Sequence, residues 1–239
     1  MKFFDEYTSN YDMNIKEINY KYHHSYRVMD NMVTLSKALC LPVKDINLAK
    51  CIGLLHDIAR FYQFKKYNSF SDLNIDHGDY AIDILKETNA LTYFDIDKCD
   101  YEVVYKAIKN HNKYEIEPNL NKRELLFSKM IRDADKLDIL YALGDESLKE
   151  IFREDDSEIS ERITKEFYQN KPIRLNFKET DNENIISLFS LIFDFNFTIS
   201  ITILKQNKYY EKIFNRLNDK NKFKPYIENV YKYIDERTR

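Results

Sequence analysis

The chain has 239 residues, and its 37 Lys and Arg against 40 Asp and Glu leave a net charge of −3. This near-balance argues against a dedicated binder of nucleic acid or of membrane surfaces. Only three glycines are present, where average usage would give about 17. They are too scattered for a dinucleotide fingerprint, a P-loop or a nucleophile elbow. Turn-rich β architectures need glycine at positive φ, so the composition favours a helical protein whose chemistry relies on side chains.

The sequence predicts a cytoplasmic protein with no membrane partner. Its N-terminus, MKFFDEYTSN, has no apolar segment of the kind found in a secretory signal, and the three cysteines show no CxxC spacing. Residues 185–204 are apolar and long enough to cross a bilayer, but Asp194 and Asn196 lie near the middle of this stretch. We therefore expect a buried helix of a soluble domain there.

Apolar residues at helical spacing define the first elements. Their spacing from Ile15 to Leu39 predicts a long helix that ends before Pro42. A second, largely apolar helix is predicted to start at an Asp45 cap and to continue unbroken through the sequence NLAKCIGLLHDIARFY. A helix that is apolar on several faces is usually central.

A polar loop over residues 65–75 and a series of shorter helices are predicted next. Asp76 is placed to cap the short helix HGDYAIDILKE. Further helices are predicted around Tyr101–His111 and Arg123–Leu143, and four or so in the last third, with breaks near Gly144, Pro172 and Pro225. The predicted fold is an all-α bundle, with a core in residues 1–145 and a helical extension in residues 146–239 that packs on this core.

Candidate metal ligands occur on five of these predicted helices. His56 and Asp57 are adjacent in the most apolar one, where burial of both is costly unless they are paired or bind a cation. The other candidates on four further helices are His24, His77, His111 and Asp135. Imidazole nitrogen and carboxylate oxygen suit divalent metals, and bundled helices can direct such side chains to one point.

The order of His24, the doublet His56-Asp57 and Asp135 resembles the HD domain superfamily of metal-dependent phosphohydrolases. The matching strings are HSYRV, LLHDIARF, DHGDYA and RDADKLD, and the resemblance covers about residues 15–145. It implies an all-α HD fold and a metal bound by His24, His56, Asp57 and Asp135.

The resemblance also implies a role for the histidines between the doublet and the final aspartate. Some branches of the superfamily use such histidines to bind a second metal, and His77 and His111 occupy these positions. Asp57 would then bridge the two metals and lie nearest the attacking water.

Two ligand positions remain open from the residues alone. His23 and His24 point about 100° apart on a helix, and the match with Arg27 and Val28 favours His24. Asp133 lies on the main apolar stripe of its helix, whereas the family string favours Asp135. Asp133 is then expected to orient a ligand histidine.

The implied function is hydrolysis of a nucleotide or another small phosphoester, mono- or diester, by a metal-activated water. The metal, one ion or two, is Mn, Fe, Mg, Ni, Co or Zn. Asp57, Arg60 and Lys136 are the predicted catalytic residues, and Arg27, Arg60 and Gln63 are predicted to bind the substrate. Arg60 is the best of these cations because it follows His56 by one helical turn. The alternative is a nucleotide-sensing or nucleotide-binding module with little turnover.

A basic segment from Lys205 to Arg216 raises a third hypothesis, contact with RNA. A solvated helix face packed by its aromatic residues is the stronger interpretation, so nucleic acid is not an expected partner. The sequence leaves the oligomeric state open.

Overall fold

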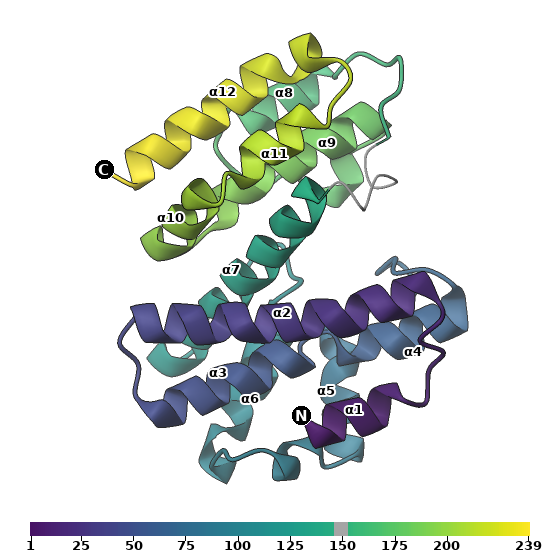
Figure 1. Cartoon of the computed structure of the whole chain (residues 1–239), viewed down its shortest axis with the longest axis vertical. Helices are drawn as coiled ribbons and strands as arrows, with labels where there is room; N and C mark the ends of the chain where they lie inside the picture. The colour runs from purple at the N-terminus through teal and green to yellow at the C-terminus, as the bar shows by residue number, and fades with distance from the viewer. Residues whose placement is uncertain (146–152) are drawn as a thin grey trace. The chain divides into compact units, whose positions relative to one another are not determined.

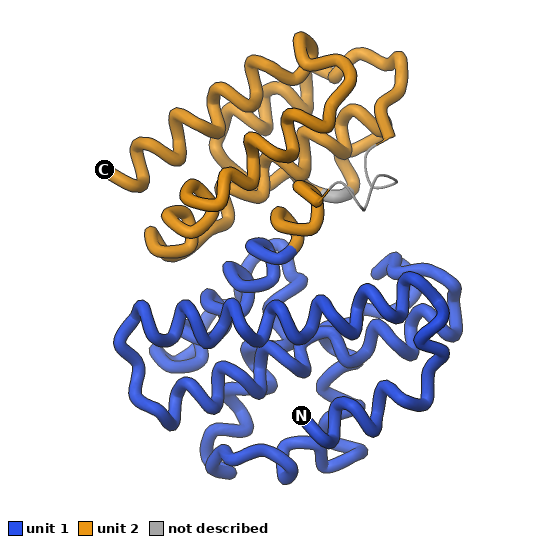
Figure 2. The backbone as a smooth tube through the Cα atoms, in the orientation of Figure 1, with its two compact units in different colours: residues 1–138 blue, residues 139–239 orange. Residues whose placement is uncertain are grey.

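The computed structural model describes residues 1–145 and 153–239, and these residues form helices, short 3-10 turns and loops without a strand (Figure 1). The predicted all-α fold is therefore confirmed. The described chain divides into two compact units, residues 1–138 and residues 139–239 (Figure 2). The division at residue 145 and the packing of residues 146–239 on the core stay predictions.

The first unit contains seven α-helices of the described chain, the last of which continues into the second unit. They are α1 (Lys2–Thr8), α2 (Lys16–Ala38), α3 (Val43–Leu55), α4 (Ile58–Tyr67), α5 (His77–Glu87), α6 (Tyr101–Asn110) and α7 (Lys122–Gly144). Two 3-10 turns, Ala90–Tyr93 and Lys98–Asp100, connect α5 to α6.

The second unit, in its described residues, is built from helices around its own apolar core. They are α8 (Glu161–Phe167), α9 (Asp181–Phe189), α10 (Thr198–Gln206), α11 (Tyr209–Asn215) and α12 (Lys220–Arg237). Among the described residues, no helix combines the length and apolar character needed to cross a bilayer.

The long helix α2 lies alongside α3 (Figure 1), and Gly53 of α3 lies close to the backbone of α2. A Cβ atom on Gly53 would lie 2.7 Å from Met29 Cα and 3.0 Å from Met29 N. Because both neighbours are backbone atoms, side-chain rotation cannot relieve such a contact. The missing side chain of Gly53 therefore allows the close packing of α3 against α2.

The predicted unbroken helix through His56 and Asp57 is wrong. Helix α3 starts at Val43 instead of Asp45 and ends at Leu55, and α4 starts at Ile58. Asp57 occupies the sparsely populated bridge region, with φ −104° and ψ 16°. Adjacent residues of a regular helix point about 100° apart, so this break allows His56 and Asp57 to face the same space.

The chain uses polar side chains to cap helices, and it uses mainly asparagine, not glycine, at positive φ. Asp76 caps α5 as predicted, because its carboxylate accepts a hydrogen bond from Asp79 N over 3.1 Å. At positive φ the described chain uses four asparagines, one cysteine and one lysine, and no glycine. Asparagine tolerates the left-handed region better than other residues with a Cβ atom, which lets turns form in this glycine-poor chain.

Two expectations for the last third are corrected. Residues 185–204 do not form one helix, because a 3-10 turn (Ser190–Asp194) and an extended Phe195 separate α9 from α10. Asn196 donates to the Asp194 carbonyl, a local bond that competes with helix continuation. Pro225 causes no break: it lies inside α12, where the buried Phe223 and Ile227 anchor the helix on both sides of it.

Candidate metal centre

Four histidines direct the ring nitrogen Nε2 into one buried space in the first unit. His24 Nε2 lies 3.2 Å from His56 Nε2, and His77 Nε2 lies 2.9 Å from His111 Nε2. All four residues are at most 4% exposed. The fold therefore brings together all the histidines predicted as ligands, from α2, α5 and the ends of α3 and α6.

The other ring nitrogen of two of these histidines is held by a carboxylate. His24 Nδ1 lies 2.6 Å from Asp138 Oδ2, and His77 Nδ1 lies 2.7 Å from Asp72 Oδ1. An ionised carboxylate can only accept, so Nδ1 carries the proton in each case. This fixes the ring orientation and increases the basicity of Nε2.

The remaining two histidines follow the last residue of a helix and donate to carbonyls of its last turn. His56 Nδ1 donates to Gly53 O over 2.8 Å, and His111 Nδ1 donates to Ile108 O over 2.6 Å. The last carbonyls of a helix have no partner within the helix. Helix ends therefore orient these two rings without further side chains.

Asp57 lies between the two histidine pairs, with one carboxylate oxygen toward each. Its Oδ2 is 3.4 Å from His24 Nε2 and 3.6 Å from His56 Nε2. Its Oδ1 is 3.3 Å from His77 Nε2 and 3.5 Å from His111 Nε2. Asp57 is 2% exposed, so this carboxylate is available to both pairs inside the protein.

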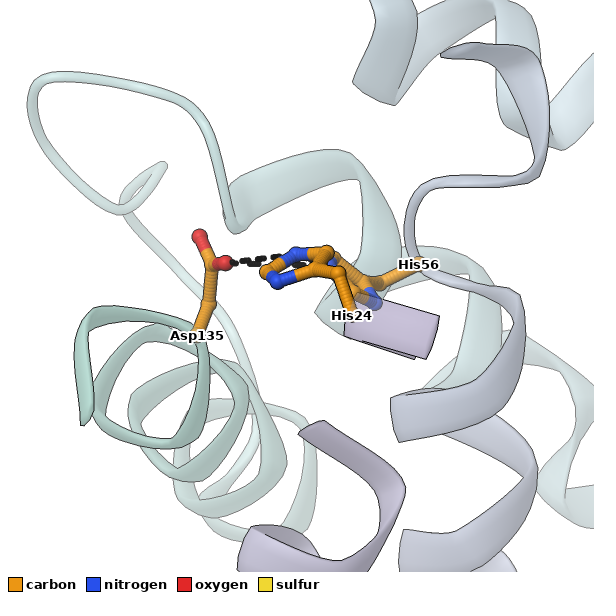
Figure 3. A group of neighbouring side chains, drawn as sticks. All are labelled: His24, His56 and Asp135. Carbon is orange, nitrogen blue, oxygen red and sulfur yellow. Dashed lines mark hydrogen bonds and ion pairs between the residues drawn. The ribbon is translucent and has the colours of Figure 1, made fainter. Parts of the chain in front are cut away.

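Asp135 on α7 completes a first ligand group with His24 and His56 (Figure 3). Its Oδ1 lies 3.2 Å from His24 Nε2 and 3.7 Å from His56 Nε2. The structure thus directs the aspartate favoured by the family string toward the histidines. Asp133 is buried on the same helix, and its role in orienting a ligand histidine stays a prediction. At His24 the carboxylate that contacts Nδ1 is that of Asp138.

Charge compensation keeps the carboxylates of the cluster ionised. Burial alone would raise the pKa of Asp57, but the ammonium of Lys21, 2.6 Å from Oδ2, and the surrounding histidines hold that pKa well below its usual range. Burial likewise opposes ionisation of Asp135, and hydrogen bonds from His24 and His56 lower its pKa well below the usual value. Both residues thus present negatively charged oxygens.

The histidines differ in charge. Burial and Lys21 lower the pKa of His24, but hydrogen bonds to Asp135, Asp138 and Asp57 outweigh them and raise it to about 10. Burial lowers the pKa of His56, and it lowers that of His77 to about 4 despite Asp72. His56 and His77 are therefore neutral near pH 7, as a metal ligand must be, whereas His24 has to lose a proton first.

These donors fit a divalent metal. Ligand atoms of His24, His56 and Asp135 lie within 4.8 Å of one another, as do those of His56, Asp57 and His111. Metal binding requires histidines whose Nε2 atoms face the site while their Nδ1 atoms are hydrogen-bonded to the protein, together with ionised carboxylates. The cluster has both. The second ligand group, His77 and His111, shares Asp57 with the first.

The predicted substrate-binding cations both contact carboxylates of the centre. Arg27 binds Asp138 through two bonds of 2.6 and 3.0 Å, and so supports the partner of His24. Arg60 Nη1 donates to Gln63 Oε1 within α4, and to Phe70 O and Asp72 Oδ1 in the loop that follows. Its Nε is buried without a hydrogen-bond partner, 3.6 Å from Asp57 Oδ1.

Gln63 and Lys136 each contact backbone carbonyls of the first unit. Gln63 is fully buried, and its amide donates to Ser71 O and Ile75 O, so it holds the loop after α4 from its buried side. Lys136 Nζ lies 3.4 Å from the Arg132 carbonyl, one turn earlier in α7. A direct role of either residue in substrate binding or catalysis stays a prediction.

Sequence reasoning did not identify three residues of this centre: Lys21, Asp138 and Asp72. Lys21 precedes His24 by three residues and Asp138 follows Asp135 by three, so helical periodicity places each on the face of a ligand and could have found it. Asp72 lies in a loop, where no periodicity applies.

The basic segment of the second unit has its charges engaged locally. Lys205 pairs with Asp235, Lys208 with Glu211, and Arg216 bonds to the Leu143 carbonyl. These contacts agree with a solvated helix face.

A family model matches the chain. The description of the matching family is HD domain, and the match covers residues 22–140. No curated protein and no solved structure matches the chain. The matched range begins two residues before His24 and ends two residues after Asp138, so it encloses every ligand candidate described above.

Proposed function

The chain belongs to the HD domain superfamily, and from this premise we propose that it is a metal-dependent phosphohydrolase acting on a nucleotide or another small phosphoester. The family consists in general of hydrolases. The proposal for this chain depends on its own cluster of ionised carboxylates and oriented imidazoles.

One observation carries the proposal: the two oxygens of Asp57 face two different ligand groups. His24, His56 and Asp135, with Asp57 Oδ2, would hold one ion, and His77 and His111, with Asp57 Oδ1, would hold a second. A carboxylate shared in this way is typical of paired metal sites that act on phosphate esters.

Bound divalent ions supply a water of lowered pKa and polarise the phosphoryl oxygens. The residues of the protein position the ligand atoms and stabilise the charge on the phosphoryl group. Asp138 and Asp72 keep Nε2 of His24 and His77 directed inward. Arg60 offers the buried, unpartnered Nε beside Asp57 to the negative charge that develops on the phosphoryl group. Arg27 supports the site by holding Asp138, and Gln63 supports it by holding the loop after α4.

The direct test is a screen of nucleoside mono-, di- and cyclic phosphates with the purified full chain and Mn²⁺. We expect phosphate-ester cleavage that His56→Ala and Asp57→Ala abolish. His23→Ala is the matched control, because His23 is exposed beside His24 and should leave activity unchanged.

The outcomes of this screen separate the two candidate functions. Saturable nucleotide binding to the Mn²⁺-loaded protein without turnover would favour the sensing module. Full metal content in both His56→Ala and Asp57→Ala would contradict metal binding at the cluster.

A further inference from the structure

Lys21 directs its ammonium group into the candidate metal centre. It lies on α2 one turn before His24, and its Nζ is 2.6 Å from Asp57 Oδ2. The Lys21 side chain is 15% exposed, whereas that of Asp57 is 3% exposed. Lys21 therefore reaches from the partly open edge of the cluster to its most central carboxylate.

This ammonium and a metal in the first ligand group would compete for the same oxygen. Asp57 Oδ2 is the atom that faces His24 and His56. A divalent metal binds a carboxylate oxygen at about 2.0–2.2 Å. An ammonium left at 2.6 Å from that oxygen would stand a few ångströms from the metal and be repelled.

Lys21 can withdraw without leaving the centre. Its chain is long and flexible and its ammonium has three rotatable donors. The ring of Phe70 lies 5.6 Å from Nζ, so a cation beside it stays favourable. Arg60, on the Oδ1 side of Asp57, is instead fixed by Gln63, the Phe70 carbonyl and Asp72.

We propose that Lys21 balances Asp57 in the metal-free protein, leaves Oδ2 when a metal binds there, and then contacts a phosphate oxygen of the substrate. The contact with substrate rests on the proposed phosphohydrolase function. Lys21 and Arg60 would then hold the phosphoryl group from both sides of Asp57. Lys21 is then a substrate-binding residue in addition to those predicted from the sequence.

Calorimetric titration of the full chain with Mn²⁺, and of the Mn²⁺-loaded chain with inorganic phosphate, tests the assignment. In Lys21→Met we expect Mn²⁺ to bind about tenfold more tightly, because a competing charge is gone. Phosphate should bind about tenfold more weakly or worse, because a charged hydrogen bond is lost. Lys37→Met, an exposed lysine of the same helix, should change neither affinity.

Opposite changes in the two affinities distinguish the proposal from simple damage to the site. An unchanged Mn²⁺ affinity, an unchanged phosphate affinity, or a loss of both would overturn it. If Lys21→Met does not fold, the closely similar Lys21→Gln is judged by the same two titrations, and Lys21→Arg should stay near wild type in both. Wild-type protein that binds no Mn²⁺ would instead refute the proposed function itself.

Discussion

Each imidazole in the cluster has one nitrogen hydrogen-bonded to the protein and one directed inward. At His24 the hydrogen-bond partner is Asp138, which Arg27 holds in turn. This chain of contacts sets both the ring orientation and the basicity of the ligand nitrogen. Asp138 therefore contributes to metal affinity without touching the metal.

Replacement of Asp138 tests this contribution. We expect Asp138→Ala to weaken Mn²⁺ binding by about 10–100-fold, the usual effect of losing such a partner. Asp138→Asn keeps an acceptor for His24 Nδ1 and should therefore lose less Mn²⁺ affinity than Asp138→Ala. Calorimetric titration measures both variants, with the exposed Asp30→Ala on α2 as the control. Equal affinity in wild type and Asp138→Ala would show that His24 needs no orienting carboxylate.

The raised pKa of His24 predicts a dependence of stability on pH. It is about 10 in the folded, metal-free protein and about 6.5 in an unfolded chain. The contribution to stability is therefore fully present below about pH 6.5 and is lost as pH rises toward 10. Urea unfolding of chelator-treated protein at several pH values measures this loss, and constant stability over that range would contradict it.

The same proton must leave His24 when a metal binds its Nε2. We expect Mn²⁺ binding to release about one proton at pH 7.5 and to strengthen as pH rises. Titrations in two buffers with different ionisation enthalpies count this proton. The same apparent enthalpy in both buffers would mean that no proton is released.

At the scale of elements, the close contact of α2 with α3 places His24 near His56. A Cβ on Gly53 would meet the Met29 backbone, so Gly53→Ala should destabilise the protein by about 1–3 kcal/mol. The better helix propensity of alanine, about 1 kcal/mol, offsets only part of this cost. Urea unfolding measures the difference, with Lys50→Ala on the exposed side of α3 as control. A more stable Gly53→Ala protein would refute the close contact.

The loop between α4 and α5 supports the second ligand group through Asp72. Gln63 holds this loop from its buried side. We expect Gln63→Leu to increase hydrogen exchange in residues 68–76 and to weaken the binding of one of two Mn²⁺ ions. Lys66→Ala, an exposed change on the same helix, serves as control. Equal weakening of both ions would indicate a general loss of structure instead.

The sequence predicts most helices but not the break that forms the site. Helix α2 and the Asp76 cap follow from periodicity and capping, which are local. Residues Leu54–Phe61 are all compatible with a helix, so nothing local predicts the interruption at His56 and Asp57. Long-range contacts of Asp57 with Lys21 and the histidines accompany its unusual backbone.

The candidate ligands could be predicted because the order of the histidines and aspartates along the chain, and the motif strings around them, match those of the family. Their partners were harder to predict, since the pairing of Asp138 with His24 joins residues 114 positions apart. Such a pairing depends on how α7 packs against α2. Asp72 could not be predicted because its loop follows no period.

At the scale of the whole molecule, glycine is scarce. The sequence has no glycine-rich loop of the kind that holds phosphate in P-loop or dinucleotide-binding proteins. Among the described residues, four of the six at positive φ are asparagines. The ligand candidates all lie between residues 24 and 135, inside the first compact unit. The second unit contributes none of them.

Metal stoichiometry tests the central claim, that Asp57 joins two ligand groups into one metal centre. Elemental analysis of protein equilibrated with Mn²⁺ and freed of excess should give about two ions per chain in the wild type. His77→Ala should retain about one, and Asp57→Ala should retain less than His77→Ala, because Asp57 serves both groups. About two ions per chain in Asp57→Ala would contradict the account.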